Sequence, residues 1–387
     1  MADCKTVFLS EIGDIVTGNT PKTSDEENYA SNDIPFLKPS DFCNDSIDLE
    51  NIEFFISEKA RNKARILPVG SIAVTCIGII GKTKVIHDEC AFNQQINAII
   101  PYDDNYNRYI AYAIAFQKEL LQLQANSAVV PIINKTDFSK ISIPLPPLET
   151  QRQIAANLDK VTHTIDLCNA ILEKLDLLVK SRFVEMFGDP IVNDKNWTVA
   201  LIGDNCFVTK LAGFEYTQYI HYEDDGDVVM VKAQNVKNGK LNDKDLSYIS
   251  SDVSDSLPRS QLSSGDIVMT YVGANIGDVA VIDDRHRYHL APNVAKIRPD
   301  SSVYNSNYFM YMLMFLNSYI VGNSADTAKA ALGMERIRKL SVFIPPLALQ
   351  QQFAAFVEQT DKSKLAVKQV LEKAETLKQA LMQEYFG

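Results

Sequence analysis

Long apolar runs are missing from this chain of 387 residues. The longest one, Tyr308 to Leu316, has about nine residues, whereas a helix that crosses a bilayer needs about 20. The N-terminus has no basic segment followed by an apolar one, so we expect neither a signal peptide nor a membrane span.

Paired cysteines are missing as well. The six cysteines are scattered and form no CxxC motif: Cys4, Cys43, Cys76, Cys90, Cys168 and Cys206. Free thiols in a reducing cytosol fit this pattern better than a disulfide framework or a zinc site. We therefore expect a cytoplasmic protein.

Signatures of catalysis are equally scarce. No GxGxxG, GxSxG or HExxH pattern occurs, and the five histidines lack metal-ligand spacing. The segment Ile77–Lys84 resembles half of a phosphate-binding loop, but Cys76 stands where the full pattern requires glycine, so we interpret it as a turn between strands. We interpret the stretch around His286 and His289 as a solvated hairpin tip. The sequence therefore predicts a binding or assembly protein with no metal and no directly bound cofactor.

An excess of basic residues is missing too. The chain has 38 Lys and Arg against 49 Asp and Glu, a formal charge of −11. Taken alone, this balance argues against nucleic-acid binding. Much of the negative charge lies in a few acidic stretches, such as those at 23–28 and 221–227. Because local patches steer binding more than the total charge does, the balance does not exclude a DNA-binding surface elsewhere.

The chain does contain a long internal repeat. The tripeptide PPL at 146–148 recurs at 345–347, an offset of 199 residues (345 − 146), and each copy is followed by a glutamine, Gln151 and Gln350. The match continues without a gap for some forty residues to a Phe-Gly pair. Since a helix whose register matters tolerates no insertion, the repeat predicts two helices of equal length, about 39 residues or roughly 58 Å each.

Both copies carry the apolar spacing of a coiled-coil seam. The seam residues are Ile154, Leu158, Val161, Ile165, Cys168, Leu172, Leu175 and Val179 in the first copy, and Phe353, Val357, Val367, Leu371 and Ala374 in the second. Thr360 and Lys364 interrupt the second copy, so we expect looser packing there. A helix with an exposed seam is not stable alone. Because a globular domain separates the copies, we expect them to pair antiparallel. The alternative is two long helices at the edges of unrelated domains.

The repeat extends into the segment before each helix. Leu67–Ile86 resembles Leu262–Ile282, and apolar alternation broken by Gly, Asp and Asn predicts strands and turns in both. Helical pieces are predicted at Tyr106–Ala125 and Ser306–Val321. We therefore expect a mixed α/β fold in which two globular domains (residues 1–146 and 189–344) alternate with two long helices (residues 147–188 and 345–387).

This layout resembles the specificity subunit of type I restriction–modification systems. The resemblance rests on the two PPL-and-glutamine helix starts, the Phe-Gly helix ends and the stretch GNTPKT at 18–23. It implies that each globular domain is a target recognition domain for one half of a split DNA sequence. It also implies that the helices form an antiparallel coiled coil that docks DNA methyltransferase subunits, two of them expected. Restriction subunits are a further candidate partner. S-adenosylmethionine, ATP and Mg would then belong to those partner subunits.

The two globular domains differ in sequence near their starts. The first domain has GNTPKT at 18–23, whereas the second has KLAGFEYTQYI at 210–220. We therefore expect domains of different sequence classes and an asymmetric target.

Polar and basic residues on the predicted loops are candidates for DNA contact. Arg and Lys pair with guanine, and Asn and Gln pair with adenine. The candidates in the first domain are Thr20, Lys22, Lys38, Lys82, Lys84, Asn93, Gln94, Gln95 and Lys135. Those in the second are Lys232, Gln234, Asn235, Tyr271, Asn275, Asn293, Arg336 and Arg338. Because phosphate contacts outnumber base contacts, the prediction concerns the loops as a whole.

Two other functions remain open at this point. One is a scaffold whose coiled coil joins other proteins while its domains bind protein or glycan. The other is a restriction enzyme with its own nuclease or methylase, which the missing catalytic motifs disfavour.

Overall fold

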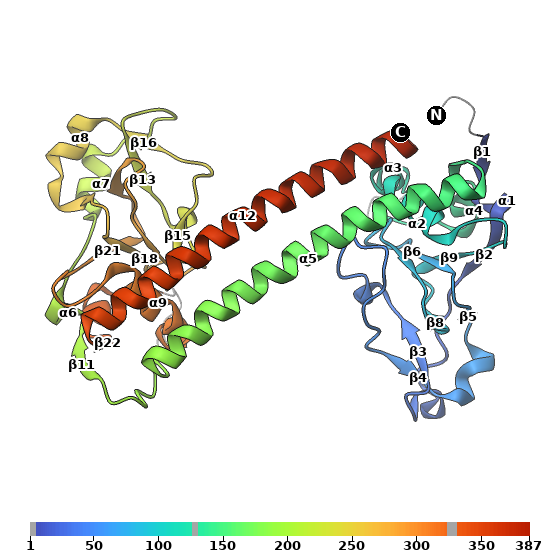
Figure 1. Cartoon of the computed structure of the whole chain (residues 1–387), viewed down its shortest axis with the longest axis horizontal. Coiled ribbons are helices and arrows are strands. Elements are labelled where there is room, and N and C mark those ends of the chain that lie inside the picture. The colour runs from blue at the N-terminus through green and yellow to red at the C-terminus, as the bar shows by residue number, and fades with distance from the viewer. Residues whose placement is uncertain (1–4, 126–130, 323–330) are drawn as a thin grey trace. The chain divides into compact units, whose positions relative to one another are not determined.

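The computed structural model describes residues 5–125, 131–322 and 331–387. The chain forms two compact units, unit 1 (Met1–Ile171 with Val367–Gly387) and unit 2 (Leu172–Ala366). Each unit contains one globular domain and part of both long helices, α5 (Leu148–Phe187) and α12 (Leu347–Phe386) (Figure 1). The predicted mixed α/β class with a duplicated domain is confirmed. The boundary between the compact units falls within each long helix and not at its end.

Unit 1 is built on two four-stranded sheets. The first has the order β2 (Gly13–Thr17), β9 (Ile96–Pro101), β6 (Ile72–Thr75), β7 (Thr83–Val85). The second has the order β4 (Phe55–Ile56), β3 (Ile34–Leu37), β8 (Cys90–Phe92), β5 (Ile66–Leu67). Neighbouring strands are antiparallel except β3 and β8. All four residues of β6 are buried, which explains why Ile72, Ala73 and Val74 are apolar in succession, because a strand covered on both faces shows no alternation.

Unit 2 repeats this topology strand for strand. Its first sheet has the order β12 (Cys206–Lys210), β21 (Val294–Pro299), β18 (Ile267–Thr270), β19 (Val279–Val281). Its second has the order β16 (Tyr248–Ile249), β13 (Val228–Val231), β20 (Arg287–Leu290), β17 (Gln261–Leu262). The parallel pair recurs as β13 and β20. The resemblance of the two sequence halves is therefore a structural repeat.

A two-stranded ribbon leads into each long helix. In unit 1 the ribbon is β1 (Lys5–Phe8) with β10 (Ser142–Leu145), and in unit 2 it is β11 (Thr198–Leu201) with β22 (Ser341–Ile344). Short helices flank the ribbons: α1 (Leu9–Ile12), α4 (Lys135–Ser139), α6 (Ile202–Asn205) and α11 (Met334–Arg338). Unit 2 adds helices α7 (Gly213–Tyr219) and α8 (Ser251–Ser256) and a hairpin of β14 (Val236–Lys237) and β15 (Lys240–Leu241).

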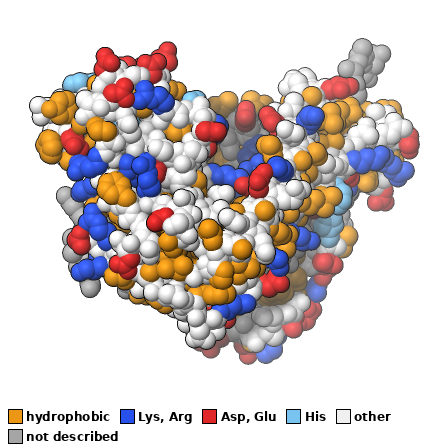
Figure 2. Space-filling view, turned by 60° about the vertical axis from the view of Figure 1, so that its left-hand side comes forward, with side chains coloured by type: hydrophobic (Ala, Val, Ile, Leu, Met, Phe, Trp, Pro, Cys, Tyr) orange, Lys and Arg blue, Asp and Glu red, His pale blue; other side chains and the backbone are white. Residues whose placement is uncertain are grey.

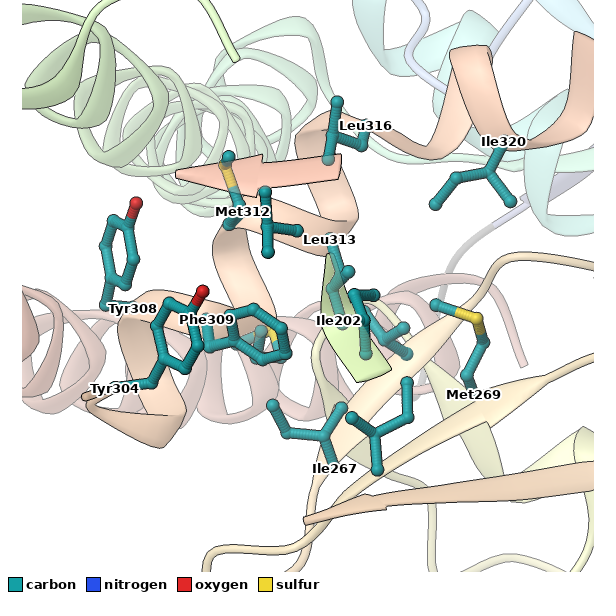
Figure 3. Packing of buried hydrophobic residues seen from close by; sticks show 14 of the residues in the cluster. Ile202, Ile267, Met269, Tyr304, Tyr308, Phe309, Met312, Leu313, Leu316 and Ile320 are labelled. Carbon is teal, nitrogen blue, oxygen red and sulfur yellow. The ribbon is translucent and has the colours of Figure 1, made fainter. Parts of the chain in front are cut away.

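The predicted helical pieces before the long helices are each broken once. They form α2 (Asn107–Phe116) and α3 (Lys118–Gln124) in unit 1, and α9 (Ser306–Phe315) and α10 (Asn317–Gly322) in unit 2. In unit 2, the side chains of Phe309 and Met312 on α9 are fully buried in the same apolar core as Ile267 of the first sheet (Figure 3). The longest apolar run of the chain is thus a core helix.

The long helices have equal length, 40 residues each, and start 199 positions apart (347 − 148). In unit 1, the core around Ile154 and Leu158 of α5 is covered by Leu381, Met382, Tyr385 and Phe386 of α12. In unit 2, Val179, Phe183 and Phe187 of α5 share a core with Phe353 and Val357 of α12. The start of each helix therefore packs on the end of the other, which confirms the antiparallel pairing (Figure 1).

The predicted seam faces inward along both helices. Ile154, Leu158, Cys168, Val179, Phe353, Val357 and Ala374 are buried, and Val161, Ile165, Leu172, Leu175, Val367 and Leu371 are partly buried. The two polar residues that interrupt the second seam, Thr360 and Lys364, both have partners within unit 2. Thr360 donates its hydroxyl to the Phe356 carbonyl, 2.9 Å away, and the Lys364 ammonium pairs with Asp176 of α5 at 2.5 Å.

The glutamine of each repeat anchors the start of its long helix. Gln350 is fully buried; its Oε1 accepts from the Asn305 amide at 2.9 Å, and its Nε2 donates to the Pro345 carbonyl at 2.8 Å. Gln151 makes the matching bonds to the Tyr106 amide and the Pro146 carbonyl, both 2.9 Å. The repeated glutamine therefore ties each long helix to the helix layer before it.

We expect Gln350→Ala to lower the free energy of unfolding of unit 2 by about 1–3 kcal/mol. The substitution leaves the buried backbone groups that Gln350 contacts without hydrogen-bond partners. Trp197, the one tryptophan of the chain, donates its Nε1–H to the Phe187 carbonyl at 2.9 Å. Its fluorescence during denaturant unfolding therefore reports on unit 2. Gln351→Ala is the control because Gln351 is exposed. Equal effects of the two substitutions would contradict the anchoring role.

Arg108 of α2 connects the loop that carries Asp48 to α5 within unit 1. Its Nε and Nη2 donate to Asp159 of α5 at 2.8 and 2.7 Å, and its Nη1 donates to Asp48 at 2.5 Å. These hydrogen bonds hold the pKa of the Asp48 carboxyl below its ordinary value, although partial burial opposes the shift. The Arg108 side chain is 20% exposed, so the pairs are partly shielded from water.

Arg108→Met should destabilise unit 1 by about 2 kcal/mol at neutral pH, the scale of hydrogen bonds to charged groups, reduced because Asp48 is 44% exposed. A carboxyl with a depressed folded-state pKa stabilises the fold above its unfolded pKa, about 3.9, and loses that contribution as the pH falls. The difference between wild type and variant should therefore narrow below about pH 4.

Thermal unfolding followed by circular dichroism across pH checks this expectation. Lys59→Met is the control, since the Lys59–Glu27 pair is exposed and such pairs contribute little. A difference that stays constant down to the acid end would contradict the role of Asp48.

Further expectations concern thiols, histidines and membranes. The described cysteines are free, and Cys4 lies outside the described residues. Within the described ranges, no group of three or more His, Cys, Asp or Glu side chains is placed to hold a metal ion. The interpretation of a solvated hairpin tip fits the exposed His286 but is wrong for His289, which is fully buried in β20. No helix in the described part of the chain is long and apolar enough to cross a membrane.

Candidate nucleic-acid interface

Each unit brings four segments of the chain together at the same end of its first sheet. In unit 1, the Cys76 amide donates to the Gln95 carbonyl at 2.8 Å, and the Ile133 amide donates to the Cys76 carbonyl at 2.9 Å. The same two bonds occur in unit 2: the Tyr271 amide donates to the Asn293 carbonyl at 2.9 Å, and the Leu332 amide donates to the Tyr271 carbonyl at 2.8 Å. We call these places loop junction 1 (residues 18–22, 76–80, 93–95 and 131–135) and loop junction 2 (residues 210, 271–277, 291–293 and 331–336).

Loop junction 1 contains the GNTPKT stretch. Gly18 lies so close to the neighbouring loop that a Cβ would come within 2.0 Å of the Asn93 carbonyl oxygen, so only glycine fits. The next residues are fixed as well, because the Asn19 amide donates to the Phe92 carbonyl at 3.0 Å and the Thr20 hydroxyl donates to Gln94 Oε1 at 2.6 Å. The predicted residues Thr20 and Gln94 are thus brought together.

Loop junction 2 has a different surface. The Lys210 ammonium lies 5.2 Å from the centre of the Tyr271 ring, a cation–π distance. Asn293 has a φ of 71°, a left-handed conformation that asparagine tolerates, and its side chain is exposed, as is that of Asn275. Arg336 is exposed on α11, at the end of the junction.

Several predicted DNA contacts are engaged inside the protein. Lys84 is 1% exposed and donates to Asn44 Oδ1 at 2.7 Å and to the Asp48 carbonyl at 3.0 Å, and burial lowers the pKa of its ammonium. Asn235 is 2% exposed and donates to the carbonyls of Asn242 and Lys244, both 3.0 Å away. In this structure both side chains hold loops and are not available to DNA.

The other predicted residues fall into two groups. Asn93 is buried and donates its Nδ2–H to Gln95 Oε1 at 3.1 Å. Four basic residues are partly exposed and contact other parts of the protein: Lys38 contacts the Phe54 ring, Lys82 the Phe42 carbonyl, Lys232 the Asp245 carbonyl and Arg338 the Val208 carbonyl. Thr20, Lys22, Gln94, Lys135, Gln234, Asn275, Asn293 and Arg336 are exposed, and Gln95 and Tyr271 are partly exposed. Contact of these ten with DNA stays a prediction.

Two basic residues at the junctions did not stand out in the sequence. Arg65 is exposed, its backbone amide donates to Asn19 Oδ1 at 2.7 Å, and its guanidinium donates to the Thr17 carbonyl. Lys210 ends β12 beside Tyr271. The available signal for Lys210 was its place at the start of the stretch 210–220, whereas Arg65 lies far along the chain from the GNTPKT stretch that it contacts.

The sequence difference between the halves is also a structural one. Residues 18–23 form an irregular loop in unit 1, whereas the corresponding part of unit 2 forms the helix α7. The side chains of Phe214 and Tyr219 on α7 are 67% and 41% exposed. The two units therefore present unlike surfaces next to their loop junctions.

Figure 2 shows how charge is arranged on one face of unit 2. Lys and Arg side chains form several groups across this face, while Asp and Glu side chains gather at its top in this view. The negative total charge of the chain, −11, is therefore unevenly distributed, and basic surface is available.

The repeated halves match a known family twice. A family model described as the type I restriction modification DNA specificity domain matches residues 1–177 and 194–378. The specificity subunit of the type I restriction enzyme MjaIX from Methanocaldococcus jannaschii is 26% identical over 374 residues, 90% of this chain and 85% of that protein. The EcoBI specificity subunit from Escherichia coli is 21% identical over 327 residues, 76% of this chain and 68% of that protein.

Solved structures share the fold. The S subunit of a type I restriction–modification system from M. genitalium aligns with a TM-score of 0.64 at 12% identity, over 100% of this chain and 96% of that one. A chain from a structure of type I system assembly and conformational transition aligns with a TM-score of 0.58 at 15% identity, over 100% and 98% of the two chains.

Proposed function

The chain belongs to the type I restriction–modification DNA specificity family, and from that premise we propose that it reads a bipartite DNA target, one half with each unit. The repeated loop junction carries this proposal, because the same backbone bonds hold different side chains at the same end of both sheets. Each family match contains one junction. Membership disfavours the alternative of a scaffold for protein or glycan partners.

The target should be asymmetric. Loop junction 1 offers Thr20 and Gln94 beside an irregular loop, whereas loop junction 2 offers Tyr271 and Asn293 beside a helix. Direct readout depends on which donors and acceptors reach the base edges. Unlike side chains at equivalent places therefore support unlike half-sites.

Chemistry would belong to partner subunits. S-adenosylmethionine would be held by modification subunits, and ATP with Mg by restriction subunits, while this chain supplies sequence choice and no catalytic group. Partners that surround the duplex would also provide phosphate contacts. This division explains how a chain with a net charge of −11 takes part in DNA binding.

Reconstitution with the cognate modification subunit tests the function. Mapping of N6-methyladenine should yield one split, non-palindromic motif whose methylation requires this chain. The isolated chain with S-adenosylmethionine and DNA should transfer no methyl group. Transfer by the isolated chain, or a motif that is unchanged when the chain is omitted, would contradict the proposal.

The outer faces of the long helices are the proposed docking surface for two modification subunits. Leu178 and Leu377 occupy equivalent positions of the repeat (377 − 178 = 199), and they are 48% and 49% exposed. More exposed apolar side chains lie on the same helices: Leu167, Leu177, Val184, Leu365 and Val370. The repeated position supports two equivalent partners, because an exposed leucine occurs at the same place on each long helix.

We expect Leu178→Asp together with Leu377→Asp to abolish co-purification of the modification subunit, because each carboxylate would be desolvated in an apolar contact. Each single variant should retain one copy. Size-exclusion chromatography with light scattering gives the stoichiometry. An unchanged melting temperature of the isolated double variant is the folding control. A double variant that still binds two modification subunits would exclude this surface.

A further inference from the structure

We propose that Gln94 reads an adenine through the major groove in the half-site bound by unit 1, and that Thr20 is the residue that positions its amide. This inference rests on the proposed function, and it names one base and one side chain. Gln94 is exposed at loop junction 1, and the Thr20 hydroxyl donates to its Oε1 at 2.6 Å.

The hydrogen bond from Thr20 leaves the amide of Gln94 suited to adenine. An amide oxygen has two lone pairs and an amide nitrogen has two N–H donors. With one lone pair occupied by Thr20, the other lone pair and the N–H groups remain. Adenine presents an N7 acceptor and an N6–H donor in the major groove, the pair that a glutamine amide contacts with two hydrogen bonds. With Oε1 accepting from Thr20, the Gln94 amide still offers one acceptor and two donors to a base.

The loop that carries Gln94 is held from several sides. The Asn93 amide donates to the Leu37 carbonyl at 3.1 Å, and the Ile96 amide donates to the Asn93 carbonyl at 3.2 Å. Asn93 Oδ1 also accepts from the Gln95 amide at 3.0 Å. A side chain on a fixed loop loses less conformational entropy on binding than one on a mobile loop. The fixed loop therefore favours a specific contact between Gln94 and a base.

The loop that carries Thr20 is held as firmly. Asn19 Oδ1 accepts from the Arg65 amide at 2.7 Å, and Asn19 Nδ2 donates to the Lys63 carbonyl at 2.7 Å. The nearby Asp25 carboxylate is paired with the Lys63 ammonium at 2.9 Å. Lys22 and Arg65 are exposed at the same junction, where they are suited to backbone phosphates.

Unit 2 has no counterpart of this amide. The matching backbone bonds place Asn93 over Ala291 and Gln95 over Asn293, so the residue equivalent to Gln94 is Pro292. Proline has no side-chain donor or acceptor. Adenine readout at this position is therefore confined to the half-site of unit 1, which provides an internal control.

Methyl transfer by the reconstituted complex tests the proposal on duplexes that carry each base pair at each position of both half-sites. Gln94→Ala should reduce the preference for A·T at one position of one half-site by roughly 5- to 150-fold, the range of a bidentate base contact. Preferences in the other half-site should stay as in wild type. Thr20→Val should reduce the same preference by a smaller factor, and Thr20→Ser, which keeps the hydroxyl, should restore it.

Two results would overturn the proposal. One is a Gln94→Ala complex with all preferences intact, and the other is a uniform loss of preference across both half-sites, which indicates a structural role. These results are distinguishable from failure of the proposed function. In that case the wild-type complex itself would show no sequence preference that depends on this chain.

Discussion

Replacing Phe183 with alanine is expected to lower the free energy of unfolding of unit 2 by about 3–5 kcal/mol, the usual cost of truncating a buried aromatic residue. Phe183 is fully buried where α5 meets both α12 and α9. Its ring lies 4.8–5.8 Å, centre to centre, from four other rings: Phe187, Tyr308, Phe315 and Phe353. The substitution therefore removes contacts to α9 and α12 together with a contact within α5.

Denaturant unfolding followed by Trp197 fluorescence measures this loss in unit 2. Leu177→Ala, at a side chain that is 62% exposed, should change the free energy of unfolding by less than about 0.5 kcal/mol. Met382→Ala tests the equivalent position of the repeat (382 − 183 = 199) in unit 1, where the side chain is only partly buried. Its effect on the circular-dichroism transition should be smaller. A Phe183→Ala loss as small as that of Leu177→Ala would contradict the packing described here.

The long helices were predictable because their signal is local and repeated. The expected range of 147–188 for the first helix compares with the observed Leu148–Phe187. A seam spacing, a proline-rich start and a glycine stop each act within a few residues. The duplication then supplies the second helix at the same offset, so the fold class and the antiparallel pairing followed without long-range information.

The candidate site was less predictable because its members are set by distant contacts. Lys84 looked available in the sequence, but its acceptors, Asn44 Oδ1 and the Asp48 carbonyl, lie 40 and 36 positions away. The Thr20–Gln94 contact spans 74 positions. The repeated glutamines were visible as a motif, yet their anchoring role depends on amides 45 positions earlier in the chain. Residue type alone therefore identified the loops of the candidate site, but it did not identify which side chains in those loops are available for contact.

Inserting one heptad into each long helix is expected to lengthen the unread gap of the target by about three base pairs. Seven residues add about 10.5 Å to a helix, and DNA rises about 3.4 Å per base pair. A heptad also preserves the apolar seam. Suitable sites are after Ile171 in α5 and after Gln369 in α12, which lie opposite each other by the register of the Asn157–Tyr385 and Asp176–Lys364 contacts.

Methylation mapping of the reconstituted complex gives the gap before and after insertion. Two-fold DNA binders place their half-sites about 10–10.5 base pairs apart, so we expect an original gap of roughly 5–8 base pairs between short half-sites. A heptad in α5 alone leaves a helix without a matched partner, and should lengthen the recognised gap or abolish methylation. Retention of helix content and of the melting transition in the doubly extended chain is the control. If that chain folds and still methylates the original motif, the paired helices do not set the spacing of the two half-sites.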